Sequence, residues 1–253
     1  MKYKAICFDI DGTLYPAQVM RGRLLRMGLR HPVIGIKYNR VRKVFRKGQK
    51  DFVRTVPFRW REAMILKNKT AVEPEQGFIE EDYRKEYSTL QNLIYDPMEK
   101  LYQKTKAIDG VAQTLGKIKN NGLKIGVFTD FPLFHKLRTM NLYEYVDFCA
   151  SSDDVGFLKP DTHCFEYLLY NLKVEPQDVL YVGDSYAKDI VGASKAGIDA
   201  VLVNVKTLKG RSRFATTAKT KYPLAKAVFS RWKDFDAWLD VNIANTATME
   251  DLQ

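Results

Sequence analysis

The sequence predicts an α/β fold, a parallel sheet with helices on both faces, into which an all-helical domain is inserted. Two observations lead to this prediction. Between residues 109 and 203, short apolar runs typical of buried strands alternate with stretches of helical periodicity. Between residues 16 and 107 the alternation stops, and the chain shows amphipathic helical segments rich in Arg, Lys, Tyr and Leu. Because each parallel strand needs a right-handed crossover, repeated strand–helix–strand units indicate a parallel sheet.

The first strand is expected over residues 2–8, a short apolar-rich run that ends before the turn signal Asp11-Gly12-Thr13. A helix is expected from Val111, because apolar residues recur at helical spacing and the stop signal Asn121-Gly122 follows. The second strand is expected at 123–128. The alternation then continues with a helix after Pro132, a strand at 146–150, a helix at 162–172, a strand at 179–182, a helix at 190–196 and a strand at 200–203.

These elements divide the chain into three parts. Residues 1–15 and 108–241 are expected to form a Rossmann-like α/β core, residues 16–107 a helical cap, and residues 242–253 a polar tail. The inserted segment leaves directly after the first strand and returns just before the helix near Asp109. Both connections therefore lie at the carboxyl end of the sheet, where open α/β folds bind ligands, and the cap is placed to act as a lid.

Composition sets the broad class of the protein. The chain has 253 residues, 45% of them hydrophobic, which is enough for a packed core. Cys7, Cys149 and Cys164 fit no zinc pattern and are too few for a disulfide framework, so we expect small core residues in a reducing compartment. The N-terminus lacks the pattern of a secretory signal, and no apolar run reaches the length of a membrane span. We therefore expect a cytoplasmic protein.

Two carboxylates follow the first predicted strand. Asp9 and Asp11 are two residues apart, so their side chains lean to one side of the strand end, and Gly12 lets the backbone approach a ligand. The same residues also suit an ordinary solvated turn. The pair alone therefore leaves both interpretations open.

Further polar residues follow the next strands. After the second strand, Thr129 and Asp130 offer a hydroxyl and exposed backbone N–H groups that could hold a phosphate oxygen, although Thr there could equally cap a helix. Lys159 precedes the helix at 162–172; most lysines are solvated, but a compact cation suits phosphate binding. Asp184 and Asp189 lie in an acidic loop after the strand at 179–182, and carboxylates are ligands that Mg²⁺ prefers. A helix cap explains either acid singly, but not why all these features fall at carboxyl ends of successive strands, where they can converge.

In order and spacing, these residues resemble the four motifs of the haloacid dehalogenase (HAD) superfamily. Those motifs are an Asp-x-Asp-Gly-Thr loop, a Thr or Ser after the second strand, a Lys, and a late Gly-Asp loop with a second acid. The resemblance covers residues 3–203 apart from the insertion, whose position resembles a helical cap of the C1 type. Tyr15 and the run Asp130-Phe131-Pro132 look closest to the phosphoglycolate phosphatase-like and nucleotidase-like branches.

The resemblance implies a role for each matching residue. Asp9 matches the nucleophile and Asp11 the general acid/base. It also implies substrate binding by Thr129, Asp130 and Lys159, Mg²⁺ binding by Asp9, Asp11 and Asp184, and support from Gly12 and Asp189. The implied activity is Mg²⁺-dependent hydrolysis of a small soluble phosphate monoester through an aspartyl-phosphate intermediate. Dehalogenases lack an acid at the position of Asp11, because they have no leaving group to protonate.

Two alternatives stay open at this stage. A phosphomutase of the same fold would keep Asp11 as well. A protein that binds nucleic acid or another anionic surface on a hydrolase scaffold is suggested by the net charge of +11, by fourteen Lys and Arg residues between 21 and 61, and by a second acid-free stretch at 206–233. However, the aromatic residues at 38, 45 and 52 are spaced like core residues of a helix. We therefore expect a small-molecule partner rather than nucleic acid, with basic cap residues that steer an anionic substrate; no pattern predicts the oligomeric state.

Overall fold

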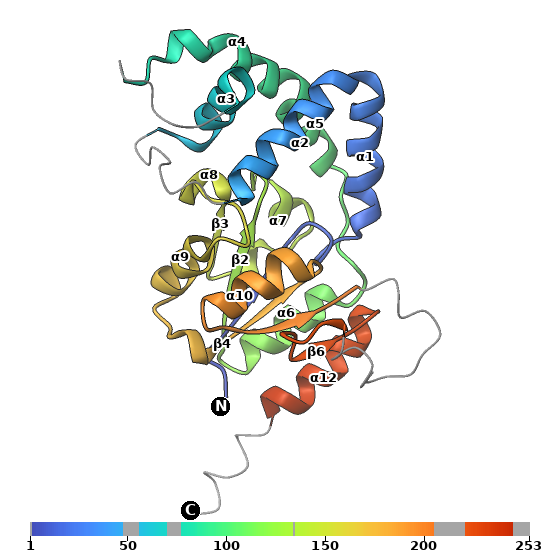
Figure 1. The fold of residues 1–253 in the computed structure, drawn as a ribbon. Helices are drawn as coiled ribbons and strands as arrows, with labels where there is room; N and C mark the ends of the chain where they lie inside the picture. Colours follow the sequence, from blue (N-terminus) through green and yellow to red (C-terminus); the bar gives the residue numbers. More distant parts are fainter. Residues whose placement is uncertain (1, 48–55, 70–76, 134, 205–220, 245–253) are drawn as a thin grey trace, which may run out of the picture.

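The computed structural model describes residues 2–47, 56–69, 77–133, 135–204 and 221–244. Its centre is a six-stranded parallel sheet in the order β3-β2-β1-β4-β5-β6 (Figure 1). The strands are β1 (Ala5–Phe8), β2 (Lys124–Thr129), β3 (Phe148–Ser151), β4 (Val179–Gly183), β5 (Asp199–Leu202) and β6 (Ala227–Val228). The predicted α/β class is confirmed.

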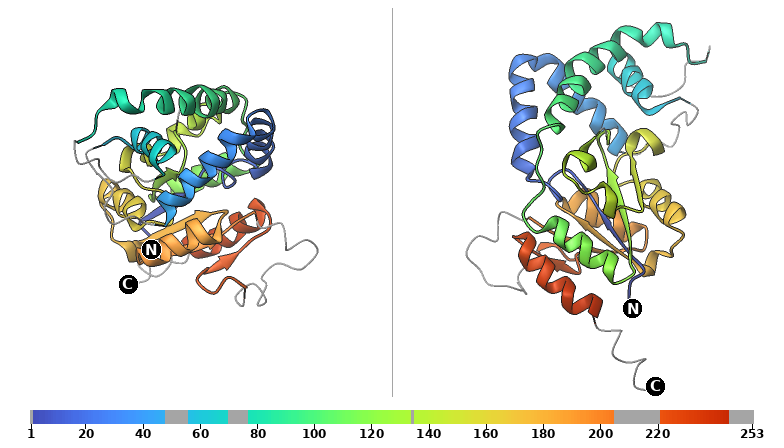
Figure 2. Two further views of the ribbon diagram at one scale, coloured as in Figure 1. Left: turned by 45° about the horizontal axis from the view of Figure 1, so that its top comes forward. Right: turned by 180° about the vertical axis from the view of Figure 1, so that it is seen from behind.

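Helices cover both faces of the sheet, as the two views from opposite sides show (Figures 1 and 2). Ile6 and Phe8 of β1 belong to the core cluster that includes α6 (Val111–Asn120) and α12 (Trp232–Ala244). Ala5 and Cys7 point to the opposite face, toward α9 (Thr162–Leu172) and α10 (Val191–Lys195), because successive strand residues alternate in direction. Of the cysteines predicted in the core, Cys7 and Cys164 are buried, whereas Cys149 is half-buried.

Most described residues from 17 to 102 lie in helices, and we call this segment the helical insert. Its helices are α1 (Ala17–Arg30), α2 (Pro32–Arg46), α3 (Phe58–Asn68), α4 (Glu80–Leu90), the π-helical turn η1 (Gln91–Tyr95) and α5 (Asp96–Tyr102). They lie over the edge of the sheet that is formed by the carboxyl ends of the strands, including the end of β1 (Figure 1). The predicted domain boundaries at 16 and 107 stay predictions.

Three elements differ from the sequence prediction. The helix expected after Pro132 is one short turn, α7 (Lys136–Thr139), and the helix expected at 190–196 begins earlier, with the π-helical turn η4 (Tyr186–Ile190). Ser185 directly precedes that turn, and its N–H donates to the carboxylate of Asp189 at 2.9 Å. Strand β6 has two residues, too few to show a period. The remaining short elements are η2 (Tyr143–Tyr145), α8 (Ser152–Val155) and η3 (Pro176–Asp178).

Two regions of interest fall partly outside the described residues. They are the basic stretch at 206–233, up to residue 220, and the polar tail at 242–253, from residue 245 onward. Among the helices that the structure does describe, none combines the length and the apolar character needed to cross a membrane.

Candidate active site

The sheet brings the ends of three neighbouring strands to one place. Strand β1 lies between β2 and β4, with Phe8 in register with Val127 on one side and Val182 on the other. Asp9 directly follows β1, and its N–H donates to the carbonyl of Val182 at 2.9 Å. Because all three strands run in parallel, the polar residues that follow them gather at one edge, as predicted.

An acidic group stands at this edge. Asp9, Asp184 and Asp189 each present a carboxylate oxygen within 4.8 Å of the others. Desolvation, opposed by Lys159 and reinforced by the charge of Asp189, raises the pKa of Asp9 to about 7. Desolvation and the charge of Asp189 likewise raise the pKa of Asp184 to about 6. Carboxylates crowded in this way are stabilised in their ionised form by a bound cation.

The donor set and its packing fit Mg²⁺, which prefers carboxylate oxygen ligands. Gly12 has φ +109°, and a Cβ atom there would lie 2.3 Å from Oδ2 of Asp184, so glycine makes room for this carboxylate. A Cβ at Gly183 would similarly fall 2.4 Å from the Cβ of Asp189. Asp189, predicted as a supporting residue, is a member of the group, whereas the side chain of Asp11, predicted as a ligand, lies outside it.

The ammonium group of Lys159 lies beside this cluster of aspartates. Its side chain is buried, and Nζ lies 2.6 Å from Oδ1 of Asp9 and 2.6 Å from Oδ1 of Asp189. The hydroxyl of Tyr181 accepts a third contact from Nζ at 3.1 Å. Burial alone lowers the pKa of Lys159, but the two carboxylates outweigh it and hold this pKa well above its usual value. A permanent positive charge therefore stands beside the predicted nucleophile.

Asp11 has a different set of partners. Both of its oxygens accept hydrogen bonds from Nζ of Lys136, at 2.9 and 3.0 Å, and the hydroxyls of Tyr15 and Thr129 donate to it as well. Desolvation raises the pKa of Asp11, but Lys136 and the two hydroxyls prevail and keep this pKa below its usual value. Lys136 is fully buried. In this structure the hydroxyl of Thr129, predicted to bind phosphate, is directed at Asp11.

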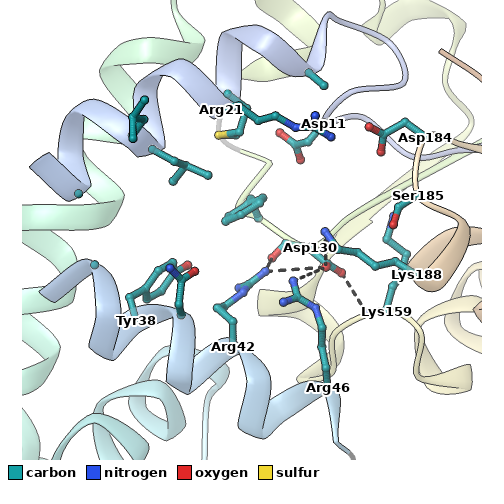
Figure 3. Close-up of a pocket in the computed structure, with 18 of the residues that line it drawn as sticks. Asp11, Arg21, Tyr38, Arg42, Arg46, Asp130, Lys159, Asp184, Ser185 and Lys188 are labelled. Carbon is teal, nitrogen blue, oxygen red and sulfur yellow. Dashed lines mark hydrogen bonds and ion pairs between the residues drawn. The ribbon is translucent and has the colours of Figure 1, made fainter. Parts of the chain in front are cut away.

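Asp130 connects the core to the helical insert. Its carboxylate lies 3.2 Å from Nη2 of Arg46 and 4.0 Å from Nζ of Lys188, and it accepts the backbone N–H of Lys159 at 3.0 Å. Its carbonyl oxygen accepts Nη2 of Arg42 at 2.7 Å. Desolvation opposes ionisation, but these cations lower the pKa of Asp130 to about 2. Asp130, predicted to bind substrate, thus holds basic side chains at the site (Figure 3).

A cavity of about 860 Å³ connects these groups. Its floor contains Asp9, Asp11, Lys159 and Asp184 from the core. Besides Lys159, the basic residues that line it are Arg21, Arg42 and Arg46 of the helical insert and Lys188 of the core, while several apolar residues come from α1 and α2 (Figure 3). Among the described basic residues between 21 and 61, Arg21, Arg42 and Arg46 therefore face the site.

Residues 3–197 match the family model described as haloacid dehalogenase-like hydrolase. The chain belongs to this family. The predicted HAD membership is thereby confirmed, since the match includes every motif residue from Asp9 to Asp189.

Individual HAD relatives match the chain to different extents. The glyceraldehyde 3-phosphate phosphatase of Methanothermobacter thermautotrophicus is 34% identical over 94 residues, which are 36% of this chain and 42% of the relative, so less than half of that relative is spanned. The enzyme of the same name from Methanopyrus kandleri is 25% identical over 216 residues, 82% of this chain and 85% of the relative. The crystal structure of a HAD phosphatase from Thermococcus onnurineus covers 93% of this chain and 97% of its own, with TM-score 0.57 and 24% identity, which supports the fold.

Sequence reasoning missed two residues of this HAD site. Lys136 contacts Asp11 across 125 positions of sequence, and Arg42 contacts Asp130 across 88. Each is one of 41 basic residues, and no local motif marks either. The one available signal for Lys136 was its place in the segment after Thr129, where the chain is close to the site.

Proposed function

We propose that this protein is a phosphatase that hydrolyses a small phosphate monoester with Mg²⁺ as cofactor. The observation that carries the proposal is the position of Asp9, whose carboxylate lies on the cavity floor beside Lys159 and within 4.8 Å of two further acids. A carboxylate in this setting can act as a nucleophile toward phosphorus while cations offset the charge of the phosphoryl group. The activity for which the two glyceraldehyde 3-phosphate phosphatases are named belongs to the same class of reaction and supports the proposal.

The reaction has two steps in this proposal. In the first, an oxygen of Asp9 attacks phosphorus, the bond to the ester oxygen breaks, and Asp11 gives that oxygen a proton. In the second, Asp11 takes a proton from water, whose oxygen attacks phosphorus and releases inorganic phosphate and free Asp9. Asp11 lines the same cavity as Asp9. The negative charge of a bound phosphate favours the protonated form of Asp11 that the first step requires.

The fixed charges of the site serve both steps. Lys159 neutralises part of the negative charge that builds up between Asp9 and the phosphoryl group. Asp9, Asp184 and Asp189 would hold Mg²⁺, which would supply a Lewis acid to offset the negative charge of the phosphoryl group. Lys136 and the hydroxyls of Tyr15 and Thr129 orient Asp11.

The structure gives less support to a nucleic-acid-binding function. Tyr38 and Phe45, two of the three aromatic residues at helical spacing, are buried in the helical insert and offer no stacking surface, while residue 52 lies outside the described residues. Arg42 is buried as well and is paired with Glu62 and Asp130. These side chains serve the packing of the insert and the cavity.

Phosphate release is the test of the proposed function. The wild type, Asp9→Asn and the surface control Asp240→Asn are assayed on p-nitrophenyl phosphate and a panel of sugar, glycolate and nucleoside monophosphates, with Mg²⁺ and with EDTA. We expect Mg²⁺-dependent release that falls at least about a thousandfold in Asp9→Asn and persists in Asp240→Asn. No release by folded wild type from any ester would refute the proposal, and an isomerised ester without free phosphate would identify a mutase.

A further inference from the structure

Helices α1 and α2 form a V above the active site (Figures 1 and 2). At its apex the two helices approach closely, since a Cβ atom on Gly35 would lie 3.3 Å from the Cα atom of Gly28. From there they diverge toward the carboxyl ends of the strands, and the cavity lies between them. The cavity between the two helices therefore extends from the reacting groups on its floor to the apex of the V.

The two ends of this cavity differ in chemistry. The floor carries charged groups, among them Asp9 and Lys159, whereas the walls of the V carry Leu25, Leu29 and Ile36. These three wall residues are 64%, 73% and 66% exposed. Large apolar side chains that are exposed together around a cavity mark a surface that gains free energy when an apolar group covers it.

The position of this surface identifies what covers it. The apolar walls are continuous with the phosphate-binding floor within one cavity, so one ligand can contact both. The residues from 17 to 47 contain no acid, and Arg21 and Arg46 line the cavity, which favours an anionic ligand. From Arg21 to Leu29 the wall follows eight residues of α1, about 12 Å of helix, enough for a chain of several methylene groups.

We infer that the substrate is an amphipathic phosphate monoester, whose phosphate lies on the floor at Asp9 and whose unbranched apolar chain lies between α1 and α2. This inference rests on the proposed function and adds to it the class of alcohol to which the phosphate is esterified. Because the wall side chains are more than half exposed to solvent, each methylene group that contacts them is only partly buried. The expected gain is about twofold in kcat/KM per added methylene, against about fourfold at full burial.

A chain-length series tests the inference. The kcat/KM values for ethyl, butyl, hexyl and octyl phosphate are measured below their micelle concentrations for wild type, Leu29→Ser, Ile36→Ser and Val33→Ser. Val33 is the matched control, because it is 65% exposed on the same pair of helices but does not line the cavity. The ratio of octyl to ethyl phosphate activity is used, since it does not depend on how much of a variant is folded.

The inference predicts a wild-type ratio well above tenfold, a fall of at least about fivefold in Leu29→Ser and in Ile36→Ser, and no change in Val33→Ser. Turnover of ethyl phosphate with a flat series would overturn the inference and leave the proposed function intact. Absence of turnover on all four esters and on p-nitrophenyl phosphate would overturn both.

Two other occupants of the V are separate outcomes. A flat series together with self-association that Leu29→Ser weakens, measured by sedimentation, would assign the apolar walls to a second copy of the chain. A flat series together with binding to phosphatidylglycerol vesicles would assign them to a membrane surface. Either result overturns the assignment to the substrate chain.

Discussion

The ion pair between Lys136 and Asp11 is the feature whose energetic role can be worked out most directly. Nζ of Lys136 lies 2.9 and 3.0 Å from the two oxygens of Asp11, with side-chain exposures of 0% and 9%. At 3 Å the attraction amounts to about 5 kcal/mol for an effective dielectric constant of about 20. Lys136→Met keeps most of the side-chain volume and removes the charge, which also removes the cost of burying an ammonium group. Because Asp11 keeps two hydroxyl donors, we expect a loss of about 3 kcal/mol in the free energy of unfolding, the lower end for a broken buried pair.

Urea unfolding of four proteins checks this value: wild type, Lys136→Met, Asp11→Asn and the double variant. The losses of unfolding free energy in the two single variants, added together, are expected to exceed the loss in the double variant by about 2 kcal/mol. The reason is that either change alone leaves one buried charge unpaired. Lys117→Met is the matched control, because Lys117 also contacts two carboxylates but is partly exposed at the surface, where such pairs contribute at most about 1 kcal/mol. Equal losses for Lys136→Met and Lys117→Met, or additive losses in the double variant, would refute the reasoning.

Two further predictions concern the loops around the cavity. The pKa of Asp130 in the folded protein, about 2, lies below its ordinary value of 3.8, so its ionised form stabilises the fold above pH 3.8 and this contribution is lost as the pH falls toward 2. The stability gap between wild type and Asp130→Asn in urea unfolding should therefore narrow by about 1 kcal/mol between pH 5 and pH 3, and a constant gap would contradict it. Gly12→Ala should weaken Mg²⁺ binding by at least about tenfold in calorimetric titration, because the new Cβ displaces the carboxylate of Asp184. Gly122→Ala, at φ +74° with no atom within 4 Å of the new Cβ, controls for backbone strain, and equal weakening by both variants would count against the steric explanation.

Local pattern was sufficient for five of the six strands of the sheet and for most of the acidic residues. The strand expected at 123–128 is β2, Lys124–Thr129, and the strand expected at 179–182 is β4, Val179–Gly183. Apolar runs between turn signals identify such strands, and the parallel topology then places Asp9 and Asp184 at one edge. Strand β6 escaped prediction because two residues show no period. Helix α7 ends after one turn, where the chain continues toward η2.

The sequence by itself determined the fold class, the family and the residues that line the floor of the site, because these depend on spacing along the chain. The tertiary structure alone decided which side chains surround Asp11 and Asp130, since Lys136 and Arg42 reach them across 125 and 88 positions. It also decided that Leu25, Leu29 and Ile36 line one cavity with the acids, because that depends on how α1 and α2 meet at Gly28 and Gly35. Contacts of this kind follow from the path of the whole chain, and no local pattern of residues carries them.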